Sequence, residues 1–224
     1  MTGSFDDHTQ GSVDQDDLPP ADPATALRLI REQQTEAARR LNPNRLYYYV
    51  PWGLAWLIGF GLFFLRFGPD GRVFVRLPTW LPLTALLVLL AAAALISGIA
   101  SVRAYSQVAG DSSRRGAWYG LAWVLGILGL SMTLGRVTEH LPNEQAGLLW
   151  AGAMVGLTGT LHLAGGAVWL DWNLFTLGVW INVINIVGLI AGPGWHALVI
   201  ALAGGGGMLL AGVFWVRNRP RSVR

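Results

Sequence analysis

The sequence lacks cysteine altogether, and it contains no lysine, so every basic side chain is an arginine. Without cysteine there is no disulfide framework, no thiolate nucleophile and no cysteine-ligated metal site. Charged residues make up only 13% of the chain, against about a quarter in an average soluble domain. The net charge of +3 is small and dispersed, which argues against a nucleic-acid partner. The use of arginine alone, with much Ala, Gly and Leu, is typical of a GC-rich bacterial genome.

The sequence is instead rich in apolar residues. Hydrophobic residues make up 53% of the sequence, and the mean hydropathy is +0.44. A transmembrane helix needs about 20 mainly apolar residues to cross a hydrocarbon core of roughly 30 Å. Six stretches have about this length: 47–66, 80–102, 117–135, 146–170, 174–191 and 197–216. The sequence therefore predicts an all-α fold, a six-transmembrane-helix bundle over residues 46–216 that is embedded in a lipid bilayer.

The arginines near the span ends predict how the bundle is oriented. Ten of them fall on the side that would hold both termini, and four fall on the opposite side: Arg66, Arg72, Arg76 and Arg136. Because an excess of arginine marks the cytoplasmic side, we expect both termini in the cytoplasm, N-in and C-in. The predicted location is the bacterial plasma membrane.

The segments that flank the spans differ in composition. Residues 1–21 are acidic and poor in apolar side chains, which predicts a disordered acidic tail. Asp22 precedes a proline and a run of apolar residues at helical spacing, which predicts a cytosolic amphipathic helix over 22–42. This helix could lie on the membrane surface, dock a cytosolic protein partner, or lead as a solvated helix into the first span. The arginines of residues 217–224 predict a basic cytosolic tail.

A short motif recurs in the odd-numbered spans. Gly53-Leu-Ala-Trp56 in the first span is repeated as Gly120-Leu-Ala-Trp123 in the third, and Gly178-Val-Trp180 in the fifth is a weaker copy. The repeat predicts three pseudo-repeated helical hairpins related by a threefold axis along the membrane normal. The competing explanation is coincidence, because glycine and tryptophan are frequent in membrane proteins.

One ionisable side chain, His162, lies inside the predicted spans. Trp172 lies in the turn between spans four and five. His162 comes ten residues before Trp172, and Asn182 comes ten residues after Trp172. At about 1.5 Å per residue, both lie roughly 15 Å from the membrane edge, near the midplane. Thr158 is one helical turn from His162, and Asn185 is one turn from Asn182. These residues predict either a substrate pathway or a hydrogen-bonded clamp between helices, and the sequence favours neither.

The sixth span contains four consecutive glycines near the same depth, Gly204, Gly205, Gly206 and Gly207. They would form part of the substrate pathway if the helix unwinds there and its backbone lines a cavity. Alternatively, they let neighbouring helices approach closely. We favour close packing because glycine is common in transmembrane helices.

A second cluster of polar side chains, with candidate ligands for a metal, lies in the predicted outer loops. His140 and Glu144 are four residues apart, and His196 lies between spans five and six. Imidazole and carboxylate together can hold a divalent metal. Loop charges are usually only solvated, however, and Pro142 interrupts the first pair, so we expect no metal site and no cofactor. The spans hold no carboxylate pair, catalytic triad, HExxH or P-loop motif, so we expect no catalytic residues and no enzyme activity.

Two segments carry a family resemblance: residues 52–71 (WGLAWLIGFGLFFLRFGPDG) and residues 192–207 (GPGWHALVIALAGGGG). They resemble uncharacterised small polytopic membrane proteins of high-GC Gram-positive bacteria, a group classed with transporters. The resemblance covers the chain after about residue 22; it implies membrane residence and transport, and no substrate.

A shorter similarity is to urea/amide channels, which are six-helix proteins built from three hairpins. It rests on Leu170-Asp-Trp172 followed by a polar span with Ile181-Asn182. The termini of that family are external, whereas those of this chain are predicted to be cytoplasmic.

Two functional hypotheses follow from the sequence. The first is a transporter or channel for a small polar solute, with the midplane polar residues as its pathway. The second is a non-transporting membrane partner or regulatory subunit, which docks a cytosolic or transporter protein through the helix at 22–42. Assembly into a homo-oligomer is compatible with both.

Overall fold

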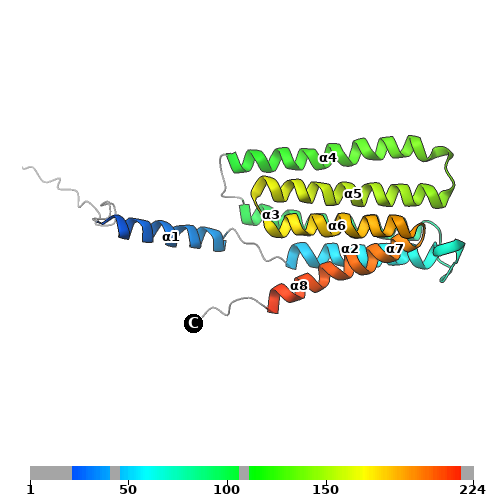
Figure 1. Cartoon of the computed structure of the whole chain (residues 1–224), viewed down its shortest axis with the longest axis horizontal. Helices are drawn as coiled ribbons and strands as arrows, with labels where there is room; N and C mark the ends of the chain where they lie inside the picture. Colours follow the sequence, from blue (N-terminus) through cyan, green and yellow to red (C-terminus); the bar gives the residue numbers. More distant parts are fainter. Residues whose placement is uncertain (1–21, 41–45, 106–110, 218–224) are drawn as a thin grey trace, which may run out of the picture. The chain divides into compact units, whose positions relative to one another are not determined.

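The computed structural model describes residues 22–40, 46–105 and 111–217 (Figure 1). The predicted acidic tail at 1–21 lies outside these residues, as does all but the first residue of the predicted basic tail at 217–224. Apart from short connections, the described residues are helical, which confirms the all-α prediction.

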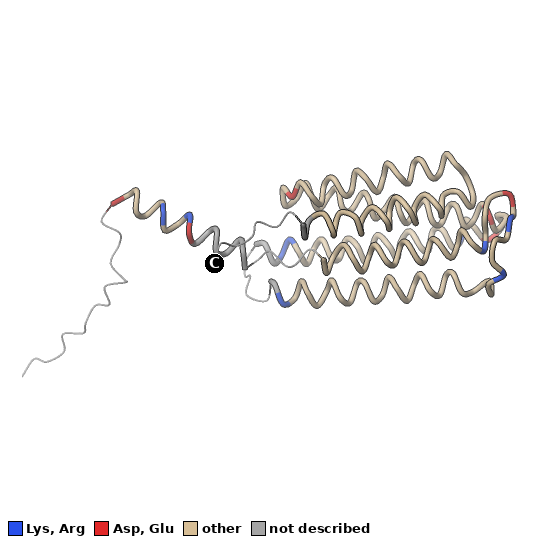
Figure 2. Tube along the Cα trace, turned by 90° about the horizontal axis from the view of Figure 1, so that it is seen from below, with Lys and Arg blue, Asp and Glu red and all other residues tan. Residues whose placement is uncertain are grey.

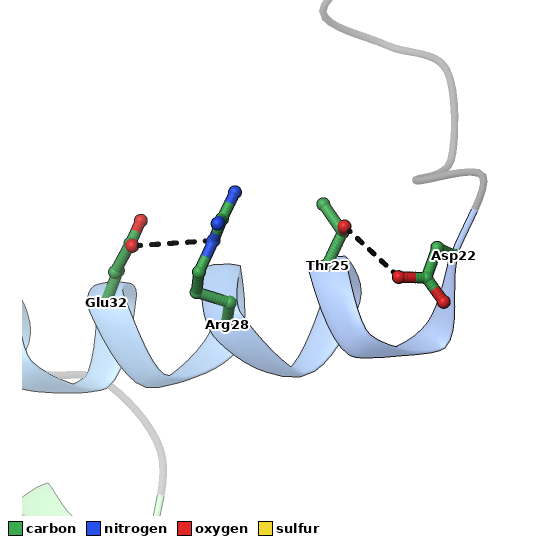
Figure 3. A network of polar contacts seen from close by, with 4 residues as sticks. All are labelled: Asp22, Thr25, Arg28 and Glu32. Carbon is green, nitrogen blue, oxygen red and sulfur yellow. Dashed lines mark hydrogen bonds and ion pairs between the residues drawn. The ribbon is translucent and has the colours of Figure 1, made fainter.

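The first helix, α1 (Pro23–Arg40), lies in a unit of its own, residues 1–42, separate from residues 43–224. The Asp22 side chain accepts hydrogen bonds from the Ala24 amide at 3.3 Å and from the Thr25 hydroxyl at 3.5 Å (Figure 3). It thereby satisfies one of the free N–H groups at the helix start. One turn further on, Arg28 and Glu32 form an i, i+4 ion pair at 3.9 Å.

Residues 46–105 and 111–217, as the structure describes them, contain six helices long and apolar enough to cross a membrane, which confirms the predicted number of spans. The first five are α2 (Leu46–Arg66), α3 (Leu81–Tyr105), α4 (Asp111–Val137), α5 (Asn143–Trp169) and α6 (Trp172–Ala191). The sixth is continuous through α7 (Trp195–Val199), a π-helix (η4, Ile200–Gly206) and α8 (Gly207–Arg217). Within this unit the charged residues lie towards the ends of the helices (Figure 2). The protein is therefore a multi-pass integral membrane protein.

Two short 3-10 helices lie in the connections, η2 (Pro69–Gly71) and η3 (Thr138–His140). The connections 67–80, 138–142 and 192–194 lie together at one end of the bundle, which we call the distal end (Figure 1). The opposite end holds the beginning of α2 and the end of α8.

The buried core of the bundle lies mainly among α2, α6 and the sixth span. Its most buried side chains include Ala55, Trp56, Ile181 and Ile200. The sixth span touches the backbone of α2 directly, because a Cβ added at Gly205 would lie only 2.4 Å from the Leu57 nitrogen. Small residues at such crossings let helix backbones approach closely and gain van der Waals contact.

Helices α3 and α4 are peripheral. Within the most apolar part of each, only 6% of the residues are buried by the rest of the chain, compared with 28% in α2 and α6 and 33% in the sixth span. The most extensive helix contact joins α5 to α6, which belong to different predicted hairpins. The three predicted hairpins are therefore not equivalent in their packing.

Candidate functional site

His162 lies at the interface between α5 and α4. Its Nδ1 is 2.7 Å from the carbonyl oxygen of Thr158. Because a carbonyl can only accept, Nδ1 carries the proton and Nε2 presents a lone pair. The half-buried ring stands at 85° to the Trp123 ring, with centroids 5.5 Å apart. No hydrogen bond joins Nε2 to another described residue, so this nitrogen is an open acceptor within the predicted midplane group.

An aromatic row continues from His162 along the same interface. Trp123 is followed by Tyr119, whose ring stands at 85° to that of Trp169 with centroids 4.8 Å apart. The Tyr119 hydroxyl donates to the carbonyl oxygen of Leu161 at 2.7 Å. Edge-to-face pairs of this kind contribute about 0.5–1.5 kcal/mol beyond their area burial. The row therefore fastens α4 to α5, and His162 is its last member.

Asn182 and Thr158 direct their polar atoms to their own helices. The Asn182 Nδ2 donates to the Gly178 carbonyl at 3.0 Å, and the Thr158 hydroxyl donates to the Met154 carbonyl at 2.8 Å. The Asn182 amide lies against Gly159 of α5, where an added Cβ would be 2.5 Å from its Nδ2. Asn182 is level with His162 by sequence count, yet no hydrogen bond connects the two among the described residues.

Asn185 forms a hydrogen-bond network that links three helices. Its Nδ2 donates to the Gly152 carbonyl of α5 at 2.9 Å, and its Oδ1 lies 2.9 Å from Nε2 of His196 in α7. The Gly152 carbonyl fixes the orientation of the amide, so Oδ1 is the acceptor and His196 Nε2 carries the proton. Asn185 is 5% exposed and His196 2% exposed. A satisfied, buried network of this kind stabilises one arrangement of α5, α6 and α7.

The sequence placed His196 in the loop between spans five and six, whereas the structure places it in the first turn of α7. No group of three His, Asp or Glu side chains that could hold a metal occurs in the part of the chain that the structure describes. The sequence signal that could have indicated the contact between Asn185 and His196 was Gly188, one helical turn after Asn185. An added Cβ at Gly188 would lie 2.8 Å from Cδ2 of His196, so the glycine leaves room for the ring.

Three of the four glycines pack against neighbouring helices, and the segment does not unwind. Gly204 faces the Trp56 ring, Gly205 faces the α2 backbone, and Gly207 faces the Trp180 indole, whereas Gly206 has open space where a Cβ would be. The segment stays helical, as the π-helix that ends at Gly206. The Trp180 Nε1 donates to the Ala203 carbonyl at 3.0 Å, and so pairs a backbone group within the π-helix.

The predicted site residues are thus brought into three separate arrangements. His162 and Thr158 lie at the α4–α5 interface, Asn182 lies between α6 and α5, and Asn185 lies with His196 near the distal end. Among the described residues, no buried side-chain nitrogen or oxygen lacks a hydrogen-bond partner. Comparisons of the chain with protein-family models, curated proteins and solved structures found no match. These contacts describe an integral membrane protein in which Asn185 joins three helices, whereas His162, Thr158 and Asn182 form hydrogen bonds within their own helices.

Proposed function

We propose that the protein is a non-transporting membrane partner that docks another protein through α1. The observation that carries this proposal is the exposure of large apolar side chains on a preformed helix. Leu27 is 56% exposed and Ile30 48%, in a unit separate from the transmembrane bundle. Ordering the helix is part of the cost of docking, and the Asp22 cap and the Arg28–Glu32 ion pair reduce that cost.

The two faces of α1 have different chemistry. Leu27 and Ile30 are three residues apart and share one face, as anchors of a groove-binding helix do. Glu32, at 100° per residue, lies about 160° from Ile30 on the polar side. The partner surface that fits this helix is an apolar groove with a polar rim.

The state of the intramembrane polar groups supports this choice over solute transport. Asn182 and Asn185 use their amides to bond the backbone of α6 and α5, and Gly205 contacts α2 directly. A pathway needs groups that can exchange partners with a solute, whereas the donor nitrogens of both amides are engaged within the protein. The arginine distribution supports placing both termini, and hence α1, in the cytoplasm of a bacterial plasma membrane.

Solute transport remains the second candidate, chiefly because of the lone pair on His162 Nε2. This lone pair makes no hydrogen bond within the described residues and lies beside Trp123 in a half-buried position. It could accept a hydrogen bond from a small polar solute.

Site-specific photo-crosslinking tests the docking proposal. A photoreactive residue is placed at Ile30 in the full-length protein in cells, with the same residue at Glu32 as the matched control. We expect a discrete protein adduct from position 30 and little or none from position 32, because only the apolar face would be covered. Adducts to lipid alone would contradict docking.

The purified protein in liposomes provides the opposing measurement. The proposal predicts no flux of small neutral solutes above that of empty liposomes. Flux that is present in the wild type and lost in a well-folded His162→Leu variant would replace the docking proposal with the transport one.

A further inference from the structure

The connection between α2 and α3 is folded back onto the end of α2. The amides of Phe74 and Val75 both donate to the Leu65 carbonyl at 3.0 Å. The Phe74 ring stacks on that of Phe64 with centroids 5.0 Å apart. A Cβ added at Gly68 would lie 2.5 Å from the Phe74 ring, so this turn needs glycine for the loop to close. The loop is therefore a packed part of the distal end.

This folding brings two arginines to one pocket. Arg66 ends α2, and its Nε donates to the Leu77 carbonyl at 2.8 Å, which leaves the two terminal amino groups of the guanidinium available. Arg66 and Arg76 line an open pocket of about 680 Å³. Its remaining wall is made of Val73, Leu77 and Pro78.

The charge of these two arginines is not neutralised within the described chain. The only ion pair there joins Arg28 to Glu32 in α1, so no described carboxylate lies within 4.0 Å of either guanidinium. Planar guanidinium groups bind phosphate oxygens through paired, charge-assisted hydrogen bonds. The pocket therefore has the donors and the charge for a phosphate group.

The position of the pocket indicates that its ligand also has an apolar part. It lies between the end of α2 and the start of α3, where the spans would leave the hydrocarbon. Trp80, two residues after Pro78, is 62% exposed. Tryptophan is enriched at the level of the lipid headgroups, where membrane meets water. Val73, Leu77 and Pro78 would contact the carbon atoms next to a phosphate.

The arginine distribution points the same way. Three of the four arginines on the arginine-poor side, Arg66, Arg72 and Arg76, fall in or beside this one connection. Because arginines are sparse on that side, a group of three in one connection calls for an explanation within that connection. An anionic ligand at this loop supplies one.

We propose that the pocket lined by Arg66 and Arg76 binds the phosphate of an anionic organophosphate, with the headgroup of an outer-leaflet phospholipid as its source. Arg66 holds the loop through its Nε and offers its amino groups to one side of the phosphate. Arg76 supplies the second guanidinium. The inference does not depend on α1 or on its proposed partner.

Lipid binding to the full-length protein in detergent tests this proposal by native mass spectrometry. The probes are phosphatidylglycerol, zwitterionic phosphatidylcholine and inorganic phosphate. Arg76→Gln is the test variant, because no hydrogen bond to another described residue ties its guanidinium into the loop. Arg72→Gln is the matched control, since it removes the same charge from the same loop outside the pocket.

We expect phosphatidylglycerol to bind in preference to phosphatidylcholine, with affinity reduced roughly tenfold or more by Arg76→Gln and less than about twofold by Arg72→Gln. Binding of inorganic phosphate with the same dependence on Arg76, and none of the lipid, would assign the site to a free phosphate. Equal effects of the two variants, or no binding of phosphatidylglycerol or of inorganic phosphate, would overturn the proposal.

Discussion

The two full copies of the Gly-Leu-Ala-Trp motif have unlike surroundings. In α2, a Cβ added at Gly53 would lie 2.9 Å from Leu209 Cγ and 3.0 Å from the Gly205 carbonyl, and Trp56 is only 4% exposed. In α4, an added Cβ at Gly120 would have no such neighbour within 4 Å, and Trp123 is half-buried. The same four residues are a core element in one helix and a partly lipid-facing element in the other.

The difference comes from the partners of each helix. The α2 copy packs against the sixth span, whose glycine run allows backbone contact on that face. The α4 copy packs only through its tryptophan, which lies in the aromatic row against α5. Because lipid chains are as apolar as leucine, burial of the remaining faces of α4 brings no hydrophobic gain. A repeated motif thus gives two membrane spans the same local composition, whereas the helix that faces each copy determines how deeply its residues are buried.

The largest predicted contrast is between the two tryptophans. Replacing Trp56 with alanine leaves a cavity in the core and should cost about 3–5 kcal/mol of unfolding free energy. Replacing Trp123 removes two edge-to-face contacts at a partly exposed position and should cost about 1–2 kcal/mol. Unfolding in mixed detergent and SDS micelles, followed by circular dichroism, measures both. Equal losses would mean that the two copies are equally packed in the membrane.

The second contrast concerns neighbouring glycines in the sixth span. A Cβ at Gly205 would lie 2.4 Å from the Leu57 nitrogen, so Gly205→Ala must separate the backbones of two helices. We expect a loss of about 2–3 kcal/mol, in the upper range for an overpacked core. Gly206 has open space at the same point and is the matched control; alanine there should be neutral or gain up to about 1 kcal/mol. Similar values in the micelle assay would contradict the close contact with α2.

The sequence was sufficient to predict the number of spans, because span length is fixed by the thickness of the bilayer. It also predicted which polar residues lie at similar depth. Depth along a helix does not determine the direction in which a side chain points. For this reason the predicted group of His162 with Asn182 and Asn185 is divided over different interfaces. Asn185 instead meets His196, which is eleven residues away along the chain and comes close only because of the turn at 192–194.

The smallest predicted contrast returns to the motif glycines themselves. Gly53→Ala places its Cβ near a leucine side chain that can move and a carbonyl that cannot, so we expect a loss of about 1 kcal/mol. Gly120→Ala meets no neighbour and removes a glycine from a helix interior, so a gain of up to about 1 kcal/mol is expected. The opposite signs are the useful result, because one substitution in one motif is then stabilising or destabilising according to the facing helix alone. A loss at Gly120 as large as that at Gly53 would indicate that another helix, from a second copy or from a partner, packs on α4 in the membrane.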